Sequence, residues 1–485
     1  MNSKNIFVVL LLFFQILTAN AKDYSASLFG IKSDGVTLNT RSIQFGIDYI
    51  NKNGGGRLVF YVGRYLTGSI HLKSNVTIHL EEGAVLVGSV NPFDYDKTIF
   101  IGLILATDQE NIGITGKGVI DGQGRILANN TIQNAHYGLV NDPLKYDRTQ
   151  ERPMLIYLRS CRNVTVKNVT LQNSAFWLET YDQCKNLLVD SITVNNKAFW
   201  NCDGADIVDC DSVQVSNCYI DAADDGICLK SHDDKVFCNN VLIKNNVVRS
   251  SANGIKFGTA GKGGFRNIKI INNTVFDTYR SAIALESVDG GFLEDVLVDG
   301  LKSIHTGNVI FLRLGERVPG RKSRMERITI KNVVAEVPES KPDAGYEYEG
   351  PVEDMPRNIS PIIIAGLPDQ YINDITFSNI DIKYPGGGNA LFANVPLDKL
   401  DNIPELPRNY PEFSMFKELP AWGIYIRHAK NLDFTDIKMN AEKKDYRLPI
   451  VIDDVHNAQF KQLKIEQVRQ KKIYYAYKST NIIIK

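Results

Sequence analysis

Three aspartates near the middle of the 485-residue chain form a candidate catalytic group. Asp203 belongs to the turn 201–204, and Asp224 and Asp225 open the next turn, which has the sequence Asp-Asp-Gly. Crowded carboxyl groups acquire different pKa values, so that one can be a general acid while another stays ionised as a base. Hydrolysis of a glycosidic bond needs an acid to protonate the leaving oxygen and a base to activate water. The three residues therefore predict a glycosidase-like site.

Such a site requires elements that hold the turns in register. A third turn, 252–254, places Asn253 where the first two turns have Asp203 and Asp225, and each turn is followed by a short apolar strand. If the repeats stack as a coil of parallel strands, neighbouring turns of the coil (rungs) lie about 4.8 Å apart, and the carboxylates would meet in one patch. A lone Asp-Asp or Asp-Gly pair is usually a solvated turn, but three acids in register between apolar strands favour a functional site.

The repeat continues through most of the chain. Units with strand-length apolar alternation begin at spacings of 23, 26, 28, 27 and 28 residues, at Asn163, Asn186, Ser212, Asn240, Asn267 and Asp295. Further units begin at Asn373, Asn431 and Asn457. An Asn at a corner tolerates left-handed backbone and can hydrogen-bond its stacked neighbour. A period of this length without helical periodicity is typical of a right-handed parallel β-helix. We therefore expect an all-β chain that forms one domain over residues 22–485.

A helix is expected before the first rungs. Asn39 or Thr40 can cap it, the glycines 54–56 can end it, and its apolar residues recur at i, i+4 and i+7, at Ile43, Ile47 and Ile50. An open coil would expose strand edges and apolar core at its end. The helix is therefore expected to cap the coil.

Two stretches, about 336–360 and 384–420, break the period. The first is rich in Pro, Glu and Asp, and the second holds three consecutive glycines and many prolines. Long loops on a coil of this kind either wall a binding groove or are surface decoration. Rungs resume after each stretch, so neither is expected to be a domain linker.

The first 21 residues have the pattern of a cleavable signal peptide. Lys4 supplies the positive charge, residues 6–17 the apolar stretch, and Ala19-Asn20-Ala21 the cleavage signal. The apolar stretch is short for a membrane span, although an N-terminal anchor helix is the alternative. We expect cleavage near Ala21 and a secreted or periplasmic protein without a membrane span.

Composition sets bounds on partners and cofactors. The 55 basic and 55 acidic residues balance, which favours neither nucleic acid nor an anionic membrane as a partner, and we expect a monomer. The seven cysteines are odd in number and confined to residues 161–238, unlike an exported disulfide framework. Buried thiols are expected, with one local disulfide left open. The chain has no Cys-x-x-Cys pair that would suggest zinc, and we expect no metal and no cofactor.

Some marked residues beside the central turns have two interpretations. Trp177 and Trp200 are expected on matching turns one rung apart, where they could stack on sugar rings or pack as structural side chains. Three further acids could suggest Ca²⁺, but their alternation with apolar residues favours ordinary strand positions: Asp206, Asp209 and Asp211.

The chain resembles glycoside hydrolase family 28, the polygalacturonase family, over nearly its whole mature length. The central motifs are Asn-x-Asp-Gly at 201–204 and the paired aspartates at 224–225, and further matching stretches are 29–35, 54–56, 152–153, 173–177, 410–412 and 419–428. The resemblance implies inverting hydrolysis of pectic substrates without a metal. It also implies that Asp224 is the general acid, that Asp203 and Asp225 hold and deprotonate the water, and that Asn201 supports the site from the same turn.

The departures from the family concern its basic residues. The histidine of its Gly-His-Gly motif is replaced by Asn253, and its Arg-Ile-Lys motif falls on residues 284–286, where Ala284 and Glu286 replace the two cations expected to grip a galacturonate carboxylate. A negative Glu286 would repel that carboxylate. Either the sugar in that subsite is neutral, or other residues supply the cations. The candidate cations are Lys230, Lys256 and Arg313, and each could instead be a solvated charge at the edge of a rung. Rhamnogalacturonan-type linkages therefore fit better than plain polygalacturonan.

Two other functions remain open at this stage. Polysaccharide lyases also use parallel β-helices, with Ca²⁺ and a Lys or Arg base, and Lys256 beside the aspartates could be such a base. The loss of the family's His, Arg and Lys also allows a carbohydrate-binding protein without activity. The acids in register favour hydrolysis over the first alternative, and the retention of all three aspartates argues against the second.

Overall fold

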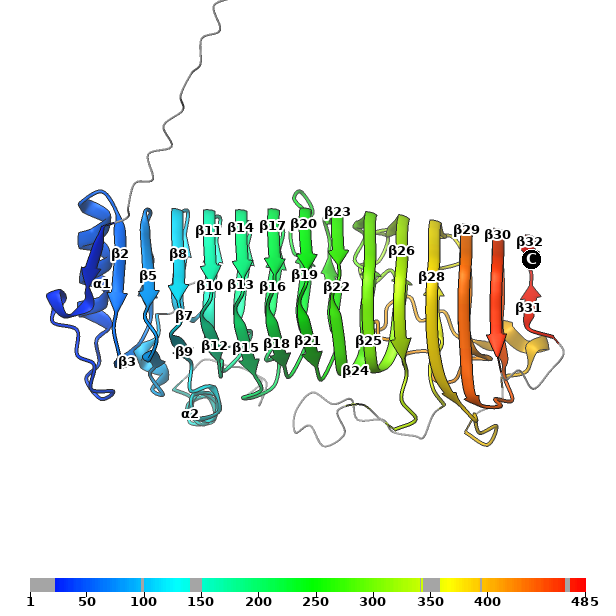
Figure 1. Ribbon diagram of the computed structural model, residues 1–485, viewed down its shortest axis with the longest axis horizontal. Coiled ribbons are helices and arrows are strands. Elements are labelled where there is room, and N and C mark those ends of the chain that lie inside the picture. Colours follow the sequence, from blue (N-terminus) through cyan, green and yellow to red (C-terminus); the bar gives the residue numbers. More distant parts are fainter. Residues whose placement is uncertain are drawn as a thin grey trace, which may run out of the picture.

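The computed structural model describes residues 22–96, 100–139, 151–340, 342, 358–392, 395–466 and 472–485. The expected signal peptide and most of the expected loop 336–360 lie outside the described residues. The described chain is a long coil of parallel strands with the first rungs at one end and the last at the other (Figure 1). The predicted parallel β-helix is thereby confirmed.

Each complete rung contributes strands to three parallel sheets. The first, called the site sheet below, contains β4 (Ile70–His71), β7 (Gly102–Thr107), β10 (Met154–Arg159), β13 (Glu179–Asp182), β16 (Ala205–Val208), β19 (Ile227–Ser231), β22 (Ile255–Gly261), β27 (Ile362–Ala365) and β31 (Tyr474–Tyr477). The second contains β1 (Asp23–Ser25), β2 (Gly56–Phe60), β5 (Val76–Leu80), β8 (Glu110–Gly116), β11 (Arg162–Lys167), β14 (Lys185–Asp190), β17 (Asp211–Ser216), β20 (Cys238–Lys244), β23 (Gly264–Ile271) and β32 (Thr480–Ile484). The third contains β3 (Gly63–Thr67), β6 (Ala84–Gly88), β9 (Val119–Asp121), β12 (Thr170–Gln172), β15 (Thr193–Asn196), β18 (Tyr219–Ala222) and β21 (Val247–Ser250).

In the later rungs single long strands run around the corners and belong to more than one sheet. They are β24 (Thr274–Ser287), β25 (Phe292–Leu314), β26 (Arg324–Glu336), β28 (Ile372–Gly386), β29 (Ala421–Lys443) and β30 (Leu448–Glu466). The end of β24 pairs with β22, and the end of β25 pairs with β27, so both extend the site sheet.

Stacked asparagines hold one corner of the coil. The first residue of each predicted unit from Asn163 to Asp295 has a positive φ between 53° and 61°, the left-handed conformation that Asn tolerates well. Their amides also bond along the coil: Asn186 donates to Asn163 at 3.0 Å, and Asn163 donates to Asn111 at 2.9 Å. The predicted role of the corner asparagines is confirmed.

The interior of the coil is filled by apolar side chains that repeat from rung to rung. Ile207, Leu229, Phe257 and Leu285 occupy equivalent inward positions of successive rungs, and all are buried. Such stacking removes apolar surface from water along the full length of the coil. All seven cysteines are buried and free, which confirms the expected thiols and excludes the local disulfide.

In the described part of the chain, two helices and three short 3₁₀ turns accompany the strands: α1 (Thr40–Lys52), α2 (Gly124–His136), η1 (Ala26–Phe29), η2 (Pro92–Asp94) and η3 (Leu397–Asn402). α1 lies at the N-terminal end of the coil (Figure 1), and its predicted apolar residues are buried in the core cluster. Asn39 is not its side-chain cap, because that amide bonds instead to the backbone of Lys32 and Thr37. The sequence reading did not predict α2.

Residues 395–420, called the strap below, fold back over the site sheet. Apolar strap residues, among them Phe413 and Phe416, join a buried cluster with Ala284, Phe311 and Tyr425, which stand on the outer side of that sheet. The second predicted insertion therefore covers part of the site sheet and is more than surface decoration.

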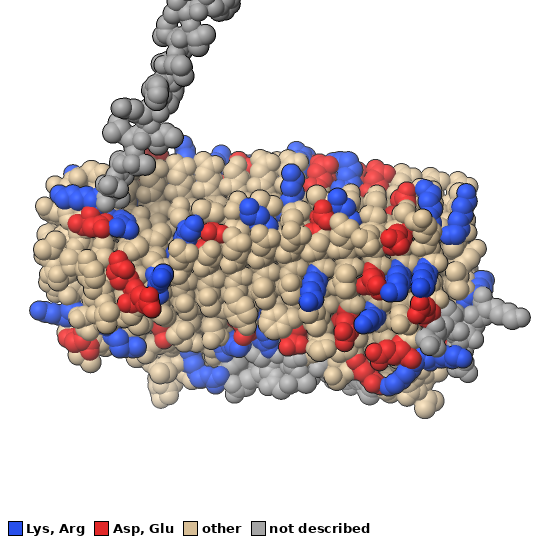
Figure 2. Space-filling model, in the orientation of Figure 1, with Lys and Arg blue, Asp and Glu red and all other residues tan. Residues whose placement is uncertain are grey.

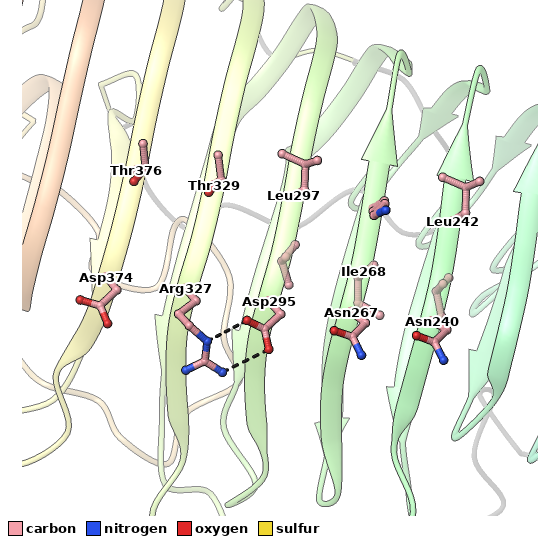
Figure 3. Close-up of a pocket in the computed structure, with 13 residues that line it drawn as sticks. Asn240, Leu242, Asn267, Ile268, Asp295, Leu297, Arg327, Thr329, Asp374 and Thr376 are labelled. Carbon is pink, nitrogen blue, oxygen red and sulfur yellow. Dashed lines mark hydrogen bonds and ion pairs between the residues drawn. The ribbon is translucent and has the colours of Figure 1, made fainter.

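Basic and acidic side chains are interspersed on the face shown in Figure 2. A shallow hollow of about 1020 Å³ lies on β20, β23, β25, β26 and β28, where Arg327 bonds Asp295 with two hydrogen bonds (Figure 3). This sheet is not the one that carries the central aspartates. No helix among the described residues is long and apolar enough to cross a membrane.

Candidate active site

The three predicted acids meet because their turns stack in register. Ala205 pairs with Ile227 and Ile227 pairs with Ile255, so Asp203, Asp225 and Asn253 each lie two residues before equivalent strand positions. The glycine between acid and strand permits this close stacking. A Cβ at Gly226 would lie 2.7 Å from the carbonyl oxygen of Gly254 and 2.4 Å from a methyl of Val248, which is too close for any side chain.

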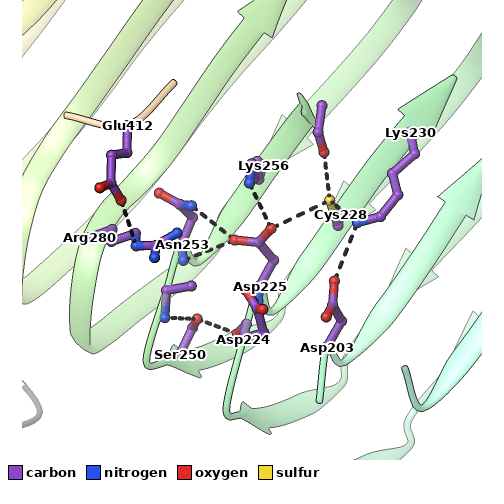
Figure 4. Close-up of polar contacts among 12 residues, drawn as sticks. Asp203, Asp224, Asp225, Cys228, Lys230, Ser250, Asn253, Lys256, Arg280 and Glu412 are labelled. Atoms are coloured by element: carbon purple, nitrogen blue, oxygen red, sulfur yellow. Dashed lines mark hydrogen bonds and ion pairs between the residues drawn. The ribbon is translucent and has the colours of Figure 1, made fainter. Parts of the chain in front are cut away.

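Asp203 belongs to a buried cluster that includes an acid the sequence analysis set aside. Lys230 Nζ lies 3.3 Å from Asp203 Oδ2 and 3.0 Å from Cys228 Sγ (Figure 4). It also lies 2.8 Å from Asp206 Oδ1. Burial, and then the charge of Asp206, raises the pKa of Asp203 well above its usual range. Burial raises the pKa of Asp206 to about 6, although Lys230 opposes the shift. Lys230 is therefore an internal counterion rather than a free cation.

Asp225 is the acid held in the ionised state. Lys256 Nζ lies 3.0 Å from its Oδ2, while the backbone and side-chain nitrogens of Asn253 donate to its Oδ1 at 3.2 and 2.9 Å. Burial acts to raise the pKa of Asp225, but Lys256, Lys230 and the bond from Asn253 outweigh it and lower the pKa to about 2. Asn253 thus orients the carboxylate from the position where the family pattern has a histidine.

Asp224 differs from its neighbours in exposure and in charge. It is half-buried, whereas Asp203 and Asp225 are buried. Its Oδ1 accepts the backbone N–H of Asp225 at 2.9 Å, and its backbone oxygen accepts the hydroxyl of Ser250 at 2.6 Å. Burial, and then the charge of Asp225, raises the pKa of Asp224. A partly accessible carboxyl with a raised pKa beside an ionised one is the arrangement that a general acid and base require.

Asn201 and Trp177 lie beside the acids, whereas Trp200 is placed differently from the expectation. Asn201 accepts a hydrogen bond from buried Arg152 at 3.0 Å, so Arg152 and Asn201 fix the turn that carries Asp203. Trp177 lies two residues before β13, in register with Asp203, and Lys230 Nζ lies 4.7 Å from its ring centre. Trp200 does not occupy the matching position, because it precedes its strand by five residues. Only Trp177 stands beside the acids.

The strap adds two residues to the site. The Tyr410 hydroxyl lies 2.9 Å from Lys256 Nζ. Glu412 Oε2 lies 2.9 Å from Arg280 Nε, and Arg280 stands on the opposite side of the aspartate pair from Lys230 (Figure 4). Burial acts to lower the pKa of the Arg280 guanidinium, but Glu412, Tyr410 and the aspartates raise it above its usual range, so it stays charged.

Glu286 is fully buried, and neither of its side-chain oxygens has a hydrogen-bond partner among the described residues. Burial raises its pKa to about 8, although Lys256 opposes the shift. The expectation that a negative Glu286 repels a carboxylate is therefore corrected: at neutral pH its carboxyl is mainly neutral. Ala284, the other departure from the family pattern, lies in the apolar cluster under the strap.

Arg313 does not reach the site. Its guanidinium donates to the carbonyl oxygens of Gly366 at 3.2 Å and of Glu405 and Leu406 in the strap at 2.5 and 3.2 Å. It is 1% exposed, because these bonds bury it between the coil and the strap. The prediction that Arg313 contacts substrate is corrected to a role in anchoring the strap.

Two residues of the site were missed for different reasons. Asp206 could have been found, since strand alternation places it outward on the same face as Lys256 when Ala205 and Ile207 point inward. Arg280 had no signal in its own surroundings, because its partner Glu412 comes from the strap. Within the described ranges no group of three His, Cys, Asp or Glu side chains could hold a metal ion.

Comparison with known proteins gives a consistent result. The model for "Glycosyl hydrolases family 28" matches residues 60–286. A probable polygalacturonase of Vitis vinifera is 30% identical over 318 residues, which are 61% of this chain and 58% of that protein. An exo-poly-alpha-D-galacturonosidase of Dickeya chrysanthemi is 24% identical over 437 residues, which are 75% of this chain and 72% of that protein. The alignment thus spans less than two thirds of the Vitis protein.

One solved structure extends the comparison to the fold. The family 28 exopolygalacturonase of Yersinia enterocolitica matches 95% of this chain and 78% of its own, with a TM-score of 0.62 and 21% identity. At this identity the likeness concerns the fold, and it agrees with the right-handed parallel β-helix expected from the repeat.

Proposed function

We propose that the chain is a member of glycosyl hydrolases family 28, whose model matches residues 60–286, and that it is an exported hydrolase of pectic polysaccharides or oligosaccharides. The observation that carries the proposal is the pair of adjacent carboxyls in different states. Asp224 is half-buried with a raised pKa, and Asp225 has its pKa lowered to about 2. Such a pair supplies the acid and the base of glycosidic hydrolysis at the same pH.

In the proposed reaction Asp224 protonates the oxygen of the leaving sugar. Asp225 takes a proton from the attacking water, and Asp203, on the neighbouring rung, holds that water with it. The water would attack from the face opposite the leaving group, which inverts the configuration of the sugar. No metal is needed, because Lys230 and Lys256 already neutralise the buried carboxylates. Asn201 and Asn253 position the two turns.

The proposed substrate is a rhamnogalacturonan-type linkage rather than plain polygalacturonan. The two positions that carry cations in the family pattern are occupied by Ala284, buried under the strap, and by Glu286, which is fully buried and mainly neutral. A subsite built on these residues favours a neutral sugar, since burying an unpaired substrate carboxylate there would be costly. We also propose that residues 1–21 direct export of the chain and that the protein is a monomer.

The lyase alternative is less well supported. A lyase base must lose its proton near neutral pH. Although burial acts in the opposite direction, Asp225 and Tyr410 raise the pKa of Lys256 well above its usual range. Lys256 would therefore keep its proton and is better suited to hold Asp225 ionised.

A product assay tests the proposal. Protein lacking residues 1–21 is incubated with homogalacturonan, rhamnogalacturonan and short pectic oligosaccharides, with and without chelator, and with Asp224→Asn as the control. We expect new reducing ends from rhamnogalacturonan that persist with chelator, show no ultraviolet absorbance and disappear in the variant. Absorbance that chelator abolishes would indicate a lyase. Binding of these sugars without any turnover would leave a carbohydrate-binding protein.

A further inference from the structure

Three cations surround the aspartates, and two of them have their donors engaged. An ammonium group has three donors. Lys230 Nζ donates hydrogen bonds to Asp203 and Cys228 and forms an ion pair with Asp206. Lys256 Nζ contacts Asp225 and Tyr410, and the side chain is only 1% exposed. Neither lysine is available to bind a substrate.

Arg280 is the exception. Its side chain is 13% exposed, and within the part of the chain that the structure describes its guanidinium has one ion-pair partner, Glu412, through Nε. A guanidinium has five N–H donors in a fork that fits a carboxylate with two bonds. The four donors of the two Nη groups have no partner among the described residues. They form the accessible cationic surface of the site.

The position of Arg280 links this surface to the reacting groups. Its charge acts on the carboxyls of both Asp224 and Asp225, so a group bound to it lies next to the proposed acid and base. Glu412 forms an ion pair with the guanidinium at Nε, which holds the side chain beside the site and leaves both Nη groups open to a ligand. Preorganisation of this kind reduces the entropy lost on binding.

We propose that Arg280 binds the carboxylate of an acidic sugar beside the cleaved linkage, a role that rests on the proposed function. The cation thus comes from a position four residues before Ala284, outside the family's Arg-Ile-Lys pattern. One available guanidinium together with a neutral Glu286 fits one acidic and one neutral sugar across the cleaved bond. The alternating backbone of rhamnogalacturonan has this composition.

The test compares each substrate with its carboxyl-reduced counterpart. Arg280→Gln and wild-type protein are assayed on an acidic oligosaccharide and on the same oligosaccharide with its carboxyls reduced to alcohols. We expect Arg280→Gln to lose kcat/KM on the order of 100-fold on the acidic substrate, as for a charged hydrogen-bonded pair, and to be nearly unchanged on the reduced one. Equal losses on both substrates would overturn the proposal and assign Arg280 to holding the strap.

Two variants separate these roles further. Glu412→Gln removes the partner of Arg280 in the strap. If Arg280 only holds the strap, Glu412→Gln and Arg280→Gln should have the same defect. If Arg280 binds the substrate carboxylate, Glu412→Gln should still prefer the acidic substrate. Arg266→Gln is the matched control, since Arg266 also pairs with a glutamate, Glu294, but on the second sheet. It should keep the wild-type preference.

The outcome is decisive even if the hydrolase proposal fails. If wild-type protein cleaves neither substrate, calorimetry measures binding of the acidic and reduced oligosaccharides to wild-type protein and to Arg280→Gln. Tighter binding of the acidic form that is lost in Arg280→Gln would support the carboxylate receptor in a protein without this activity. Binding without any preference for the acidic form would refute it.

Discussion

The fully buried Glu286 gives the most quantitative prediction. Its pKa of about 8 in the folded protein compares with an ordinary value of 4.5, so the folded state keeps a proton that the unfolded chain loses. The stability contributed by the neutral carboxyl is fully present below pH 4.5 and is lost as pH rises through 8. In Glu286→Gln the side chain keeps the shape of the neutral carboxyl but cannot ionise in either state.

The size of the effect follows from the two pKa values. The free energy of unfolding of Glu286→Gln minus that of wild type should be larger than at pH 4 by about 2 kcal/mol at pH 6 and by about 4 kcal/mol at pH 8. Urea unfolding of both proteins at these pH values measures the difference, and Glu110→Gln on the exposed end of β8 controls for the substitution itself. Parallel stability curves for Glu286→Gln and wild type would refute the reasoning, because they would mean that Glu286 is ionised in the folded protein.

Three further predictions concern the site. Asp224→Asn should lower kcat by roughly 10²- to 10⁴-fold, as for loss of a general acid, with an unchanged unfolding midpoint, and a variant with normal turnover would reject the assignment. Lys256→Met removes the charge that lowers the pKa of Asp225, so the acid limb of the kcat/KM profile should move to higher pH; an unmoved limb would remove Asp225 as the base. Gly226→Ala places a methyl 2.7 Å from the Gly254 carbonyl oxygen and should destabilise the fold by about 1–3 kcal/mol, measured by urea unfolding against Gly261→Ala, where the added methyl would lie 3.5 Å from its nearest neighbour, the ring of Phe265. Equal losses in the two glycine variants would show that crowding between rungs is not the cause.

The sequence predicted the parts of the molecule that depend on local repetition. The corner asparagines and the glycine after each acid fix the register of neighbouring rungs, and Asp203 and Asp225 are brought together by that register alone. Lys256 was a candidate for the same reason, since it follows the third turn by two residues on the strand. Its partner was not predictable in detail, because whether an ammonium faces a substrate or a carboxylate depends on side chains of the neighbouring rungs.

The strap explains what the repeat could not predict. Tyr410 reaches Lys256 across 154 positions of the sequence, and nothing in the period of the rungs indicates where such an excursion returns. Arg313 was misassigned for the same reason, since the carbonyl groups that bury it belong partly to the strap. Asp206 is different. Its outward direction followed from strand alternation, but the same alternation with apolar residues is what an ordinary strand position shows.

The strap also has a consequence for the order in which the protein assembles. Rungs that carry the aspartates pair through their strands with neighbouring rungs and can stack as soon as residues up to the end of β24 are present. Tyr410 and Glu412 dock later, because the apolar cluster that seats the strap includes Tyr425 and Val451 from β29 and β30. Long-range contacts of this kind form late, since the loop must close first. A chain emerging N-terminus first would thus stack its acids early and complete the site around Lys256 and Arg280 only after the last rungs have folded.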